Sequence, residues 1–315
     1  MKAIILENPG EPKNLKLTEI EKPQIKEGEV LVEIKSISIN PIDVKTRSGK
    51  GLFTKLNNDK PIILGWDISG IIVETNSSMF NVNDEVFGMI NFPGHGKAYT
   101  QFATASENHI TLKPKNISFE EAAATSLAAL TALQAIEKAE LEGGQNVLIH
   151  AASGGVGHFA VQIAKYFGAS VTGTSSDKNR EFVLSLGADQ HIDYKNYNWE
   201  NSKEKFDFIL DTIGGENIDH SVKVLKKGGT IISIPSGLNE DVEEKAAFVD
   251  AKGFPMLVQS NGNDMKKLAE LLEKGIIKPH IYKTYHFDEM SIAHEELEKG
   301  RTVGKIVVNF SEIAE

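Results

Sequence analysis

Short runs of aliphatic and β-branched residues fill roughly the first 120 positions of the chain. The runs read MKAIIL, EVLVEIKSISI, DISGIIVET and DEVFGMI, and they are punctuated by Pro9, Pro23, Pro41, Pro61 and Pro93. Short apolar runs bounded by turn residues are typical of strands. We therefore expect this segment to fold as a partly open β-barrel.

The pattern changes near residue 121, where the Ala- and Leu-rich stretch EEAAATSLAALTALQAIEKAE predicts a long helix. Beyond it, the apolar runs NVLIH, SVTGTS, FDFILDT and GTIISI alternate with the helical patterns HFAVQIAKYFG, NREFVLSLG and NIDHSVKVLKKG. Alternating strands and helices indicate a parallel sheet covered on both faces. Gly168, Gly187 and Gly228 stand where helices are expected to end.

The last block returns to a strand, a helix and the run KIVVNF, which is too short to stand alone and should rejoin the sheet of the first block. We therefore predict one domain from residues 1–121 and 280–315, and a second from residues 122–279. The polar stretch KNYNWENSKEK is expected to be a surface helix or loop.

Composition narrows the possible functions. The 315 residues are 40% hydrophobic and 25% charged, carry a net charge of −10 and include no cysteine. The acidic balance argues against nucleic acid as a partner. Without cysteine there is no disulfide, no thiolate metal site and no cysteine nucleophile. No leader-like start or membrane-length apolar run is present, so we expect a cytoplasmic protein that does not contact a membrane.

A small-residue turn, AASGGVG, lies between the strand NVLIH and the next helix. Ala152, Gly154 and Gly157 occupy the three glycine positions of the dinucleotide-binding pattern, with alanine as a departure at the first. A bare second position lets a pyrophosphate approach the backbone, and the helix N-terminus favours its charge. We predict cofactor contacts at Ser153, Gly154, Gly155 and Val156, although a tight turn needs glycine for structural reasons alone.

The end of the second predicted strand bears on which dinucleotide binds. NAD sites usually place an acid there to bond the ribose, whereas this chain has Ser175 and Ser176, followed by Lys178 and Arg180. Hydroxyls and cations suit a 2′-phosphate, so we favour NADPH. Asp177 would become the ribose acid if the strand ended later, and SSDKNR also fits a simple helix cap.

Several segments resemble the medium-chain dehydrogenase/reductase superfamily, and within it the zinc-free, zeta-crystallin-like quinone oxidoreductases. They are INPIDVKTRSG, LGWDISG, LTALQAI, VLIHAASGGVGHFAVQIAK, LGADQHIDY and VGKIVV, and they span nearly the whole chain. The resemblance implies an α/β protein with a Rossmann doubly wound parallel-sheet domain and a GroES-like β-barrel domain. It also implies a catalytic cleft where the two domains meet.

The resemblance further implies that the catalytic metal is missing. Asn40 stands where zinc dehydrogenases of the superfamily have a cysteine ligand, and Trp66 stands where they have a histidine. Asp43 and Asp67 cannot complete a zinc site alone, and the histidines show no ligand spacing. Without a Lewis acid, reducing a conjugated acceptor is easier than oxidising an alcohol. We therefore predict a reductase of quinones or α,β-unsaturated carbonyls that binds no metal.

The resemblance implies roles for further residues. Asn40 is expected beside the nicotinamide, although it also reads as a turn residue before Pro41, and Asp43 could orient Lys45 or Arg47 or form a surface ion pair. We take Asn40 and Asp43 as the catalytic candidates. Asn40 is also expected to bind the cofactor, together with Tyr194, Lys305 and Thr131, which equally fits helix packing. The glycine turn and the strand ends complete the predicted set of cofactor contacts: Ser153, Gly154, Gly155, Val156, Ser175, Ser176, Lys178, Thr212, Ile213 and Ile234.

Two other functions stay open at this point. One is reduction of enoyl groups or enals, on acyl-CoA or lipid aldehydes, by the same hydride step. The other is a non-catalytic NADPH-binding protein. No side chain stands out as the proton donor, and water serves as well. A homodimer is expected.

Overall fold

The computed structural model describes residues 1–310, which divide into two compact units. The first comprises Met1–Leu130 and the chain from Gln259, and the second comprises Thr131–Val258. The helix α8 (Gly262–Glu273) thus belongs to the first unit, whereas the sequence placed it in the second. It packs there against β8 (Ile110–Leu112), and Asn116 Nδ2 donates to Leu272 O at 3.2 Å.

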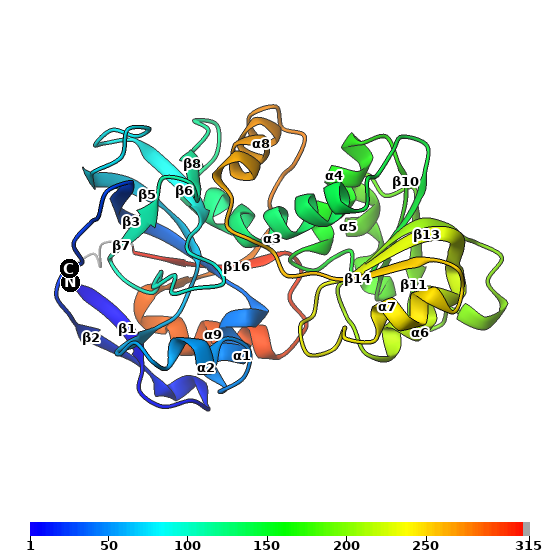
Figure 1. Cartoon of the computed structure of the whole chain (residues 1–315), viewed down its shortest axis with the longest axis horizontal. Coiled ribbons are helices and arrows are strands. Elements are labelled where there is room, and N and C mark those ends of the chain that lie inside the picture. Colours follow the sequence, from blue (N-terminus) through cyan, green and yellow to red (C-terminus); the bar gives the residue numbers. More distant parts are fainter. Residues whose placement is uncertain (311–315) are drawn as a thin grey trace. The chain divides into compact units, whose positions relative to one another are not determined.

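Two sheets build the first unit (Figure 1). The smaller has the order β2-β1-β4, and the larger has the order β15-β16-β3-β5-β6-β8, with β7 also paired to β3. The remaining strands are β1 (Lys2–Leu6), β2 (Leu15–Glu19), β3 (Glu29–Ile39), β4 (Ile62–Ile63), β5 (Asp67–Thr75), β6 (Glu85–Met89), β7 (Phe102–Ser106), β15 (Ile281–His286) and β16 (Lys305–Asn309).

The long strand β3 organises this unit because most of its side chains are buried and it pairs with β5, β7 and β16. The pairing with β16 places Ile306 opposite Ile39, which confirms that KIVVNF rejoins the sheet of the first block. The helical elements of this unit, besides α8, are α1 (Pro41–Arg47), α2 (Phe53–Leu56), α9 (Met290–Glu298), η1 (Pro12–Asn14) and η4 (Phe287–Glu289). The helix α3 (Phe119–Lys138) contains the boundary between the units.

The second unit is a six-stranded parallel sheet in the order β11-β10-β9-β12-β13-β14. Numbered within the unit, this is the 3-2-1-4-5-6 order of the doubly wound dinucleotide-binding fold, which is the fold class that the sequence predicted. The strands are β9 (Asn146–Ile149), β10 (Ser170–Ser175), β11 (Gln190–Asp193), β12 (Phe206–Asp211), β13 (Leu225–Ser233) and β14 (Lys252–Pro255).

Helices connect these strands and cover the sheet. They are α4 (Gly157–Tyr166), α5 (Arg180–Ser185), α6 (Glu216–Val224) and α7 (Val242–Ala247), with the short turns η2 (Asp177–Asn179) and η3 (Trp199–Asn201). Figure 1 shows α6 and α7 side by side, and they are in contact. Within residues 1–310, no helix is long and apolar enough to cross a membrane.

Two of the three glycines expected at helix ends lie there. Gly168 follows α4 and Gly187 follows α5, both with positive φ. The prediction for Gly228 is wrong, because α6 ends at Val224 and β13 begins at once, so that Gly228 lies inside this strand. Trp199 also departs from the surface expected for its segment, since it is buried in the core with Phe206 and Ile218.

Candidate functional site

The glycine turn links β9 to α4 and is fastened to the neighbouring strand β10. Ala152 N donates to Thr174 O at 2.8 Å, and Ala151 N donates to Thr174 Oγ1 at 3.2 Å. A Cβ on Gly157 would lie 2.2 Å from Ala151 O, so this glycine lets the helix start directly against the turn. A Cβ on Gly154 would lie 3.2 Å from the same oxygen, which a small shift accommodates. The turn thus presents bare backbone where the pattern expects a pyrophosphate.

The second strand of the sheet, β10, ends at Ser175, which is buried. The Ser175 hydroxyl donates to Ser176 O at 3.0 Å, so it accepts the hydrogen bond from His191 Nε2, at 2.8 Å. The Nδ1 atom of His191 is buried without a partner, and burial lowers the pKa of this imidazole. A neutral serine tied to a histidine therefore stands where NAD enzymes carry an acid.

Beyond this strand end, Asp177 lies in η2 rather than in β10. Its carboxylate forms an exposed ion pair with Arg180 Nε at 3.0 Å. Lys178 is exposed, Ser176 is half-buried, and Asn179 Nδ2 donates to Ser153 Oγ at 3.1 Å, which connects this segment to the glycine turn. Tyr194, half exposed, is held to the same strand end because its N–H donates to Ser175 O at 3.3 Å.

Asp211, the buried last residue of β12, organises the next two strand ends. Its carboxylate accepts hydrogen bonds from the backbone N–H groups of Ile213 and Gly214, and from Asn217 Nδ2 and Ser233 Oγ, at 2.8–3.2 Å. Its carbonyl accepts from Ile234 N at 3.0 Å. The structure thus fixes the predicted contacts Thr212, Ile213 and Ile234 at the carboxyl edge of the sheet.

In the first unit, a buried polar cluster surrounds Asn40. Its Nδ2 donates to Asp67 Oδ2 at 2.8 Å, and its Oδ1 accepts from Lys305 Nζ. Lys305 also donates to Ile39 O at 3.1 Å, and Asp67 Oδ1 accepts from Leu127 N at 2.8 Å. Both ends of the Asn40 amide are therefore fixed by charged groups within this unit.

Asp43 lies in the same cluster, in the first turn of α1, and is fully buried. Its Oδ2 accepts from Asn40 N at 2.6 Å, whereas its Oδ1 has no hydrogen-bond partner. Burial raises the pKa of Asp43 to about 8, and the Asp67 carboxylate adds to the rise. Burial also raises the pKa of Asp67, to about 6. The surface ion pair considered for Asp43 is wrong because the carboxyl is buried, and Arg47 pairs with Glu298 instead.

The residues at the positions where zinc dehydrogenases carry metal ligands do not fit zinc. Trp66 is buried with its Nε1 donating to Gly94 O at 2.8 Å, an indole nitrogen is not a zinc ligand, and Asn40 offers only an amide. Among residues 1–310, no group of three or more His, Cys, Asp or Glu side chains is placed to hold a metal ion.

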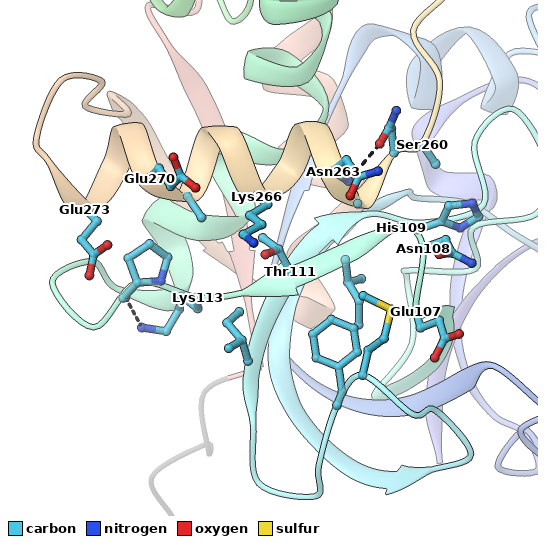
Figure 2. Close-up of a pocket in the computed structure, with 18 of the residues that line it drawn as sticks. Glu107, Asn108, His109, Thr111, Lys113, Ser260, Asn263, Lys266, Glu270 and Glu273 are labelled. Atoms are coloured by element: carbon cyan, nitrogen blue, oxygen red, sulfur yellow. Dashed lines mark hydrogen bonds between the residues drawn. The ribbon is translucent and has the colours of Figure 1, made fainter.

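A pocket of about 880 Å³ lies elsewhere in the first unit, between β8 and α8. Figure 2 shows Asn263, Lys266, Glu270 and Glu273 along the helix, with Thr111 and Lys113 on the opposite wall. None of the predicted site residues lines this pocket. Its mixed charges single out no ligand.

The structure groups the predicted residues by unit. The second unit gathers Ser153, Gly154, Gly155, Val156, Ser175, Ser176, Lys178, Tyr194, Thr212, Ile213 and Ile234 at or beside the carboxyl ends of its strands. Thr131 is buried in α3, and Asn40, Asp43 and Lys305 form the cluster of the first unit. Sequence reasoning missed His191 and Asn179 as partners of Ser175 and Ser153. Only the position of His191 one strand along from Ser175 could have suggested the first pairing.

A 3-2-1-4-5-6 sheet with a glycine turn after its first strand, joined to a mainly antiparallel strand-rich unit, defines a class of two-domain dehydrogenases and reductases. Comparison with known proteins agrees. Residues 26–118 match the alcohol dehydrogenase GroES-like domain, and residues 186–308 match the zinc-binding dehydrogenase model.

Individual relatives cover most of the chain. It is 38% identical over 299 residues to 2-methylene-furan-3-one reductase of Solanum lycopersicum, covering 91% of this chain and 73% of that protein. It is 34% identical over 320 residues to the chloroplastic NADPH-dependent alkenal/one oxidoreductase of Arabidopsis thaliana, covering 98% and 79%. A quinone oxidoreductase from Coxiella burnetii superimposes with a TM-score of 0.94 at 37% identity over 99% of both chains. The chain belongs to the medium-chain dehydrogenase/reductase superfamily.

Proposed function

We propose that the protein is an NADPH-dependent oxidoreductase that reduces quinones or α,β-unsaturated carbonyl compounds without a metal. The observation that carries the cofactor assignment is the end of β10, where buried Ser175 replaces the ribose-binding acid of NAD sites. Asp177 falls outside the strand, and its charge is matched by Arg180. The NADPH-dependent relative from Arabidopsis thaliana supports the same choice.

The glycine turn fits the cofactor. Its second glycine leaves open the space that a side chain would fill, and its third sets the helix against the turn. Ser153, Gly154, Gly155 and Val156 would hold the pyrophosphate, and Ser176 and Lys178 would hold the 2′-phosphate, with Tyr194 nearby. Thr212, Ile213 and Ile234 would contact the ribose and nicotinamide side. When bound, NADPH supplies the hydride.

The polar cluster of the first unit supplies the groups that we assign to catalysis. Lys305 and Asp67 fix the Asn40 amide in one orientation. We therefore assign to Asn40 the positioning and polarisation of the groups that bind beside it. Asp43 holds a proton at neutral pH because its pKa is raised to about 8, and its Oδ1 has no partner among the described residues. Asp43 is therefore the candidate acid, and we also assign Lys305 and Thr131 to cofactor contacts.

The names of the relatives support the substrate class, since they include a quinone oxidoreductase and a reductase of alkenals and enones. Hydride addition to either kind of acceptor leaves a negative charge that conjugation spreads, so no Lewis acid is needed. The residues in the ligand positions, Asn40 and Trp66, support the metal-free form of this chemistry.

The test is to mix the full chain with NADPH or NADH and a panel of quinones and enones, and to follow the absorbance of the reduced nicotinamide. We expect turnover with NADPH and several acceptors. Tight NADPH binding with no turnover on any acceptor would favour the non-catalytic binding protein instead. Absence of NADPH binding would contradict the proposal.

We also propose a reducing, cytoplasmic setting and a homodimer. The absence of cysteine supports the reducing setting. The homodimer is supported by β14, which lies at the edge of the second unit's sheet and can pair with a strand of another chain. Light scattering on the purified chain would test the dimer, with a monomer mass as the contrary result.

A further inference from the structure

His150 is the residue that separates β9 from the glycine turn, and it is completely buried. Its backbone already bridges two strand ends. His150 N donates to Leu210 O of β12 at 3.0 Å, and His150 O accepts from Thr212 Oγ1 at 2.9 Å. The imidazole adds two further contacts, with Thr174 Oγ1 at 3.3 Å from Nδ1 and with Ser221 Oγ at 3.0 Å from Nε2.

The neighbouring hydrogen bonds fix which ring nitrogen carries the proton. Ser221 Oγ donates to Asn217 O at 2.8 Å, so it must accept from His150 Nε2. Burial lowers the pKa of His150 to about 4, so the ring is neutral and Nε2 carries its proton. His150 Nδ1 is then an acceptor, and Thr174 Oγ1, which accepts from Ala151 N, donates to it.

The resulting chain of hydrogen bonds crosses the carboxyl edge of the sheet. It runs from Ala151 N through Thr174 and the His150 ring to Ser221 and Asn217, and Asn217 Nδ2 continues to Asp211 at 2.8 Å. Ala151, at its first end, has a positive φ of 47°, a backbone conformation that a residue with a side chain adopts only when its surroundings hold it.

We propose that His150 is a positioning residue that couples the glycine turn to the turn after β12, so that the pyrophosphate and ribose contacts keep one fixed spacing. This inference rests on the proposed function. The hydrogen bond to Thr174, which we call the Thr174 arm, holds the glycine turn. The hydrogen bond to Ser221, the Ser221 arm, holds the loop that carries Thr212 and Ile213. His150, Thr174 and Ser221 are not among the residues that we assign to cofactor contacts.

Two substitutions separate the arms. His150→Asn keeps an acceptor near the place of Nδ1, and therefore the Thr174 arm, but loses the bond to Ser221. His150→Gln keeps a donor near the place of Nε2 and loses the Thr174 arm. Both remove the ring that lies 5.5 Å from Trp199, so their losses of thermal stability should be similar. The matched control is His220→Gln, because the His220 ring also packs on Trp199, at 5.9 Å, but lies outside the network.

The measurements are the NADPH dissociation constant by titration calorimetry, KM and kcat, and the thermal midpoint of each full-length variant. We expect His150→Gln and Thr174→Val each to weaken NADPH binding about three- to tenfold, the scale of one lost hydrogen bond. His150→Asn, which breaks the bond to Ser221, should weaken binding by a similar factor, and His220→Gln should match the wild type. The double variant Thr174→Val/His150→Gln should bind as the single variants do.

An NADPH affinity unchanged from the wild type in either His150→Asn or His150→Gln would overturn the inference, because a residue that couples the two turns needs both bonds. An equal loss in His220→Gln would also overturn it and leave His150 a packing residue. Additive losses in the double variant would also overturn it. A wild type that binds neither NADPH nor NADH would instead refute the proposed function, so the two failures are distinguishable.

Discussion

Replacing Ser175 with aspartate tests the cofactor assignment, and the structure changes what the substitution should do. Without a neighbouring imidazole, the new carboxylate would repel the 2′-phosphate of NADPH and accept a hydrogen bond from the free 2′-hydroxyl of NADH. Here, however, the Ser175 hydroxyl lies 2.8 Å from His191 Nε2. An aspartate at this position would bond the imidazole, raise its pKa and form an ion pair, which offsets the charge that the phosphate would otherwise meet.

The size of this compensation follows from charge and distance. Two unit charges about 4 Å apart interact by roughly 4 kcal/mol at an effective dielectric constant of about 20. His191 is partly exposed, so solvent and salt reduce this, and we expect about 1 to 2 kcal/mol to remain. That corresponds to roughly five- to thirtyfold in affinity. Ser175→Asp alone should therefore lower the NADPH preference by only about threefold, and Ser175→Asp/His191→Gln by about tenfold more.

The assay is the ratio of kcat/KM for NADPH to that for NADH in the wild type, both single variants and the double variant, treated as a double-mutant cycle. His191→Gln keeps a donor for Ser175 without a titrating group, so it should change the ratio little. An equal shift with and without His191 would refute the ion-pair reasoning. A wild type that prefers NADH would refute the assignment of the 2′-phosphate to this strand end.

Three further predictions concern the metal, the glycines and pH. Metal analysis of the purified protein should find no stoichiometric zinc, and activity should survive a chelator; one tightly held zinc per chain, lost together with activity, would contradict this. Gly154→Val should weaken NADPH binding at least about tenfold, because the side chain fills the space of the pyrophosphate, and it should change the thermal midpoint little, because a 3.2 Å contact of its Cβ with Ala151 O needs only a small shift. Gly157→Ala should mainly lower the midpoint, because its Cβ would lie 2.2 Å from that backbone oxygen. Equal effects on binding and folding would make the turn purely structural. Asp43 has its folded-state pKa raised from 3.8 to about 8, so its contribution to stability is full below pH 4 and is lost as the pH rises to 8, at about 1.4 kcal/mol per pKa unit as an upper bound. Asp43→Asn should therefore gain stability relative to the wild type across that range in denaturant titrations, and a pH-independent difference would show that Asp43 is ionised in the folded protein.

Local patterns made the second unit predictable. The alternation of strands and helices and the small residues from Ala151 to Gly157 are confined to short segments, so periodicity and turn chemistry were enough to place β9, α4 and β10. Gly228 was misplaced because the helical pattern ran on past Val224 and nothing local marks the strand that starts at Leu225. Trp199 sits in a polar stretch, and its burial depends on the core that Phe206 and Ile218 supply.

The site depends on contacts that no local pattern encodes. Lys305 meets Asn40 across 265 positions of sequence, and this contact follows from the pairing of β16 with β3. The bond between Ser175 and His191 needs the register of two parallel strands, which places Asp193 opposite Ser175 and His191 one side-chain period away. The sequence pointed to most of these residues singly, but a single sequence does not show which of them touch.

The interrupted course of the first unit has a consequence for synthesis on the ribosome. Its sheet takes β3 from before the second unit and β15 and β16 from after it, whereas Thr131–Val258 is continuous. Domains generally fold as units while the chain emerges. The second unit can therefore complete its sheet first, while residues 36–39 of β3, next to the stretch that β7 pairs, stay unpaired on that edge until β16 is made. Newly made chains are accordingly most exposed to strand-to-strand aggregation during that interval, at the edge that β16 will close.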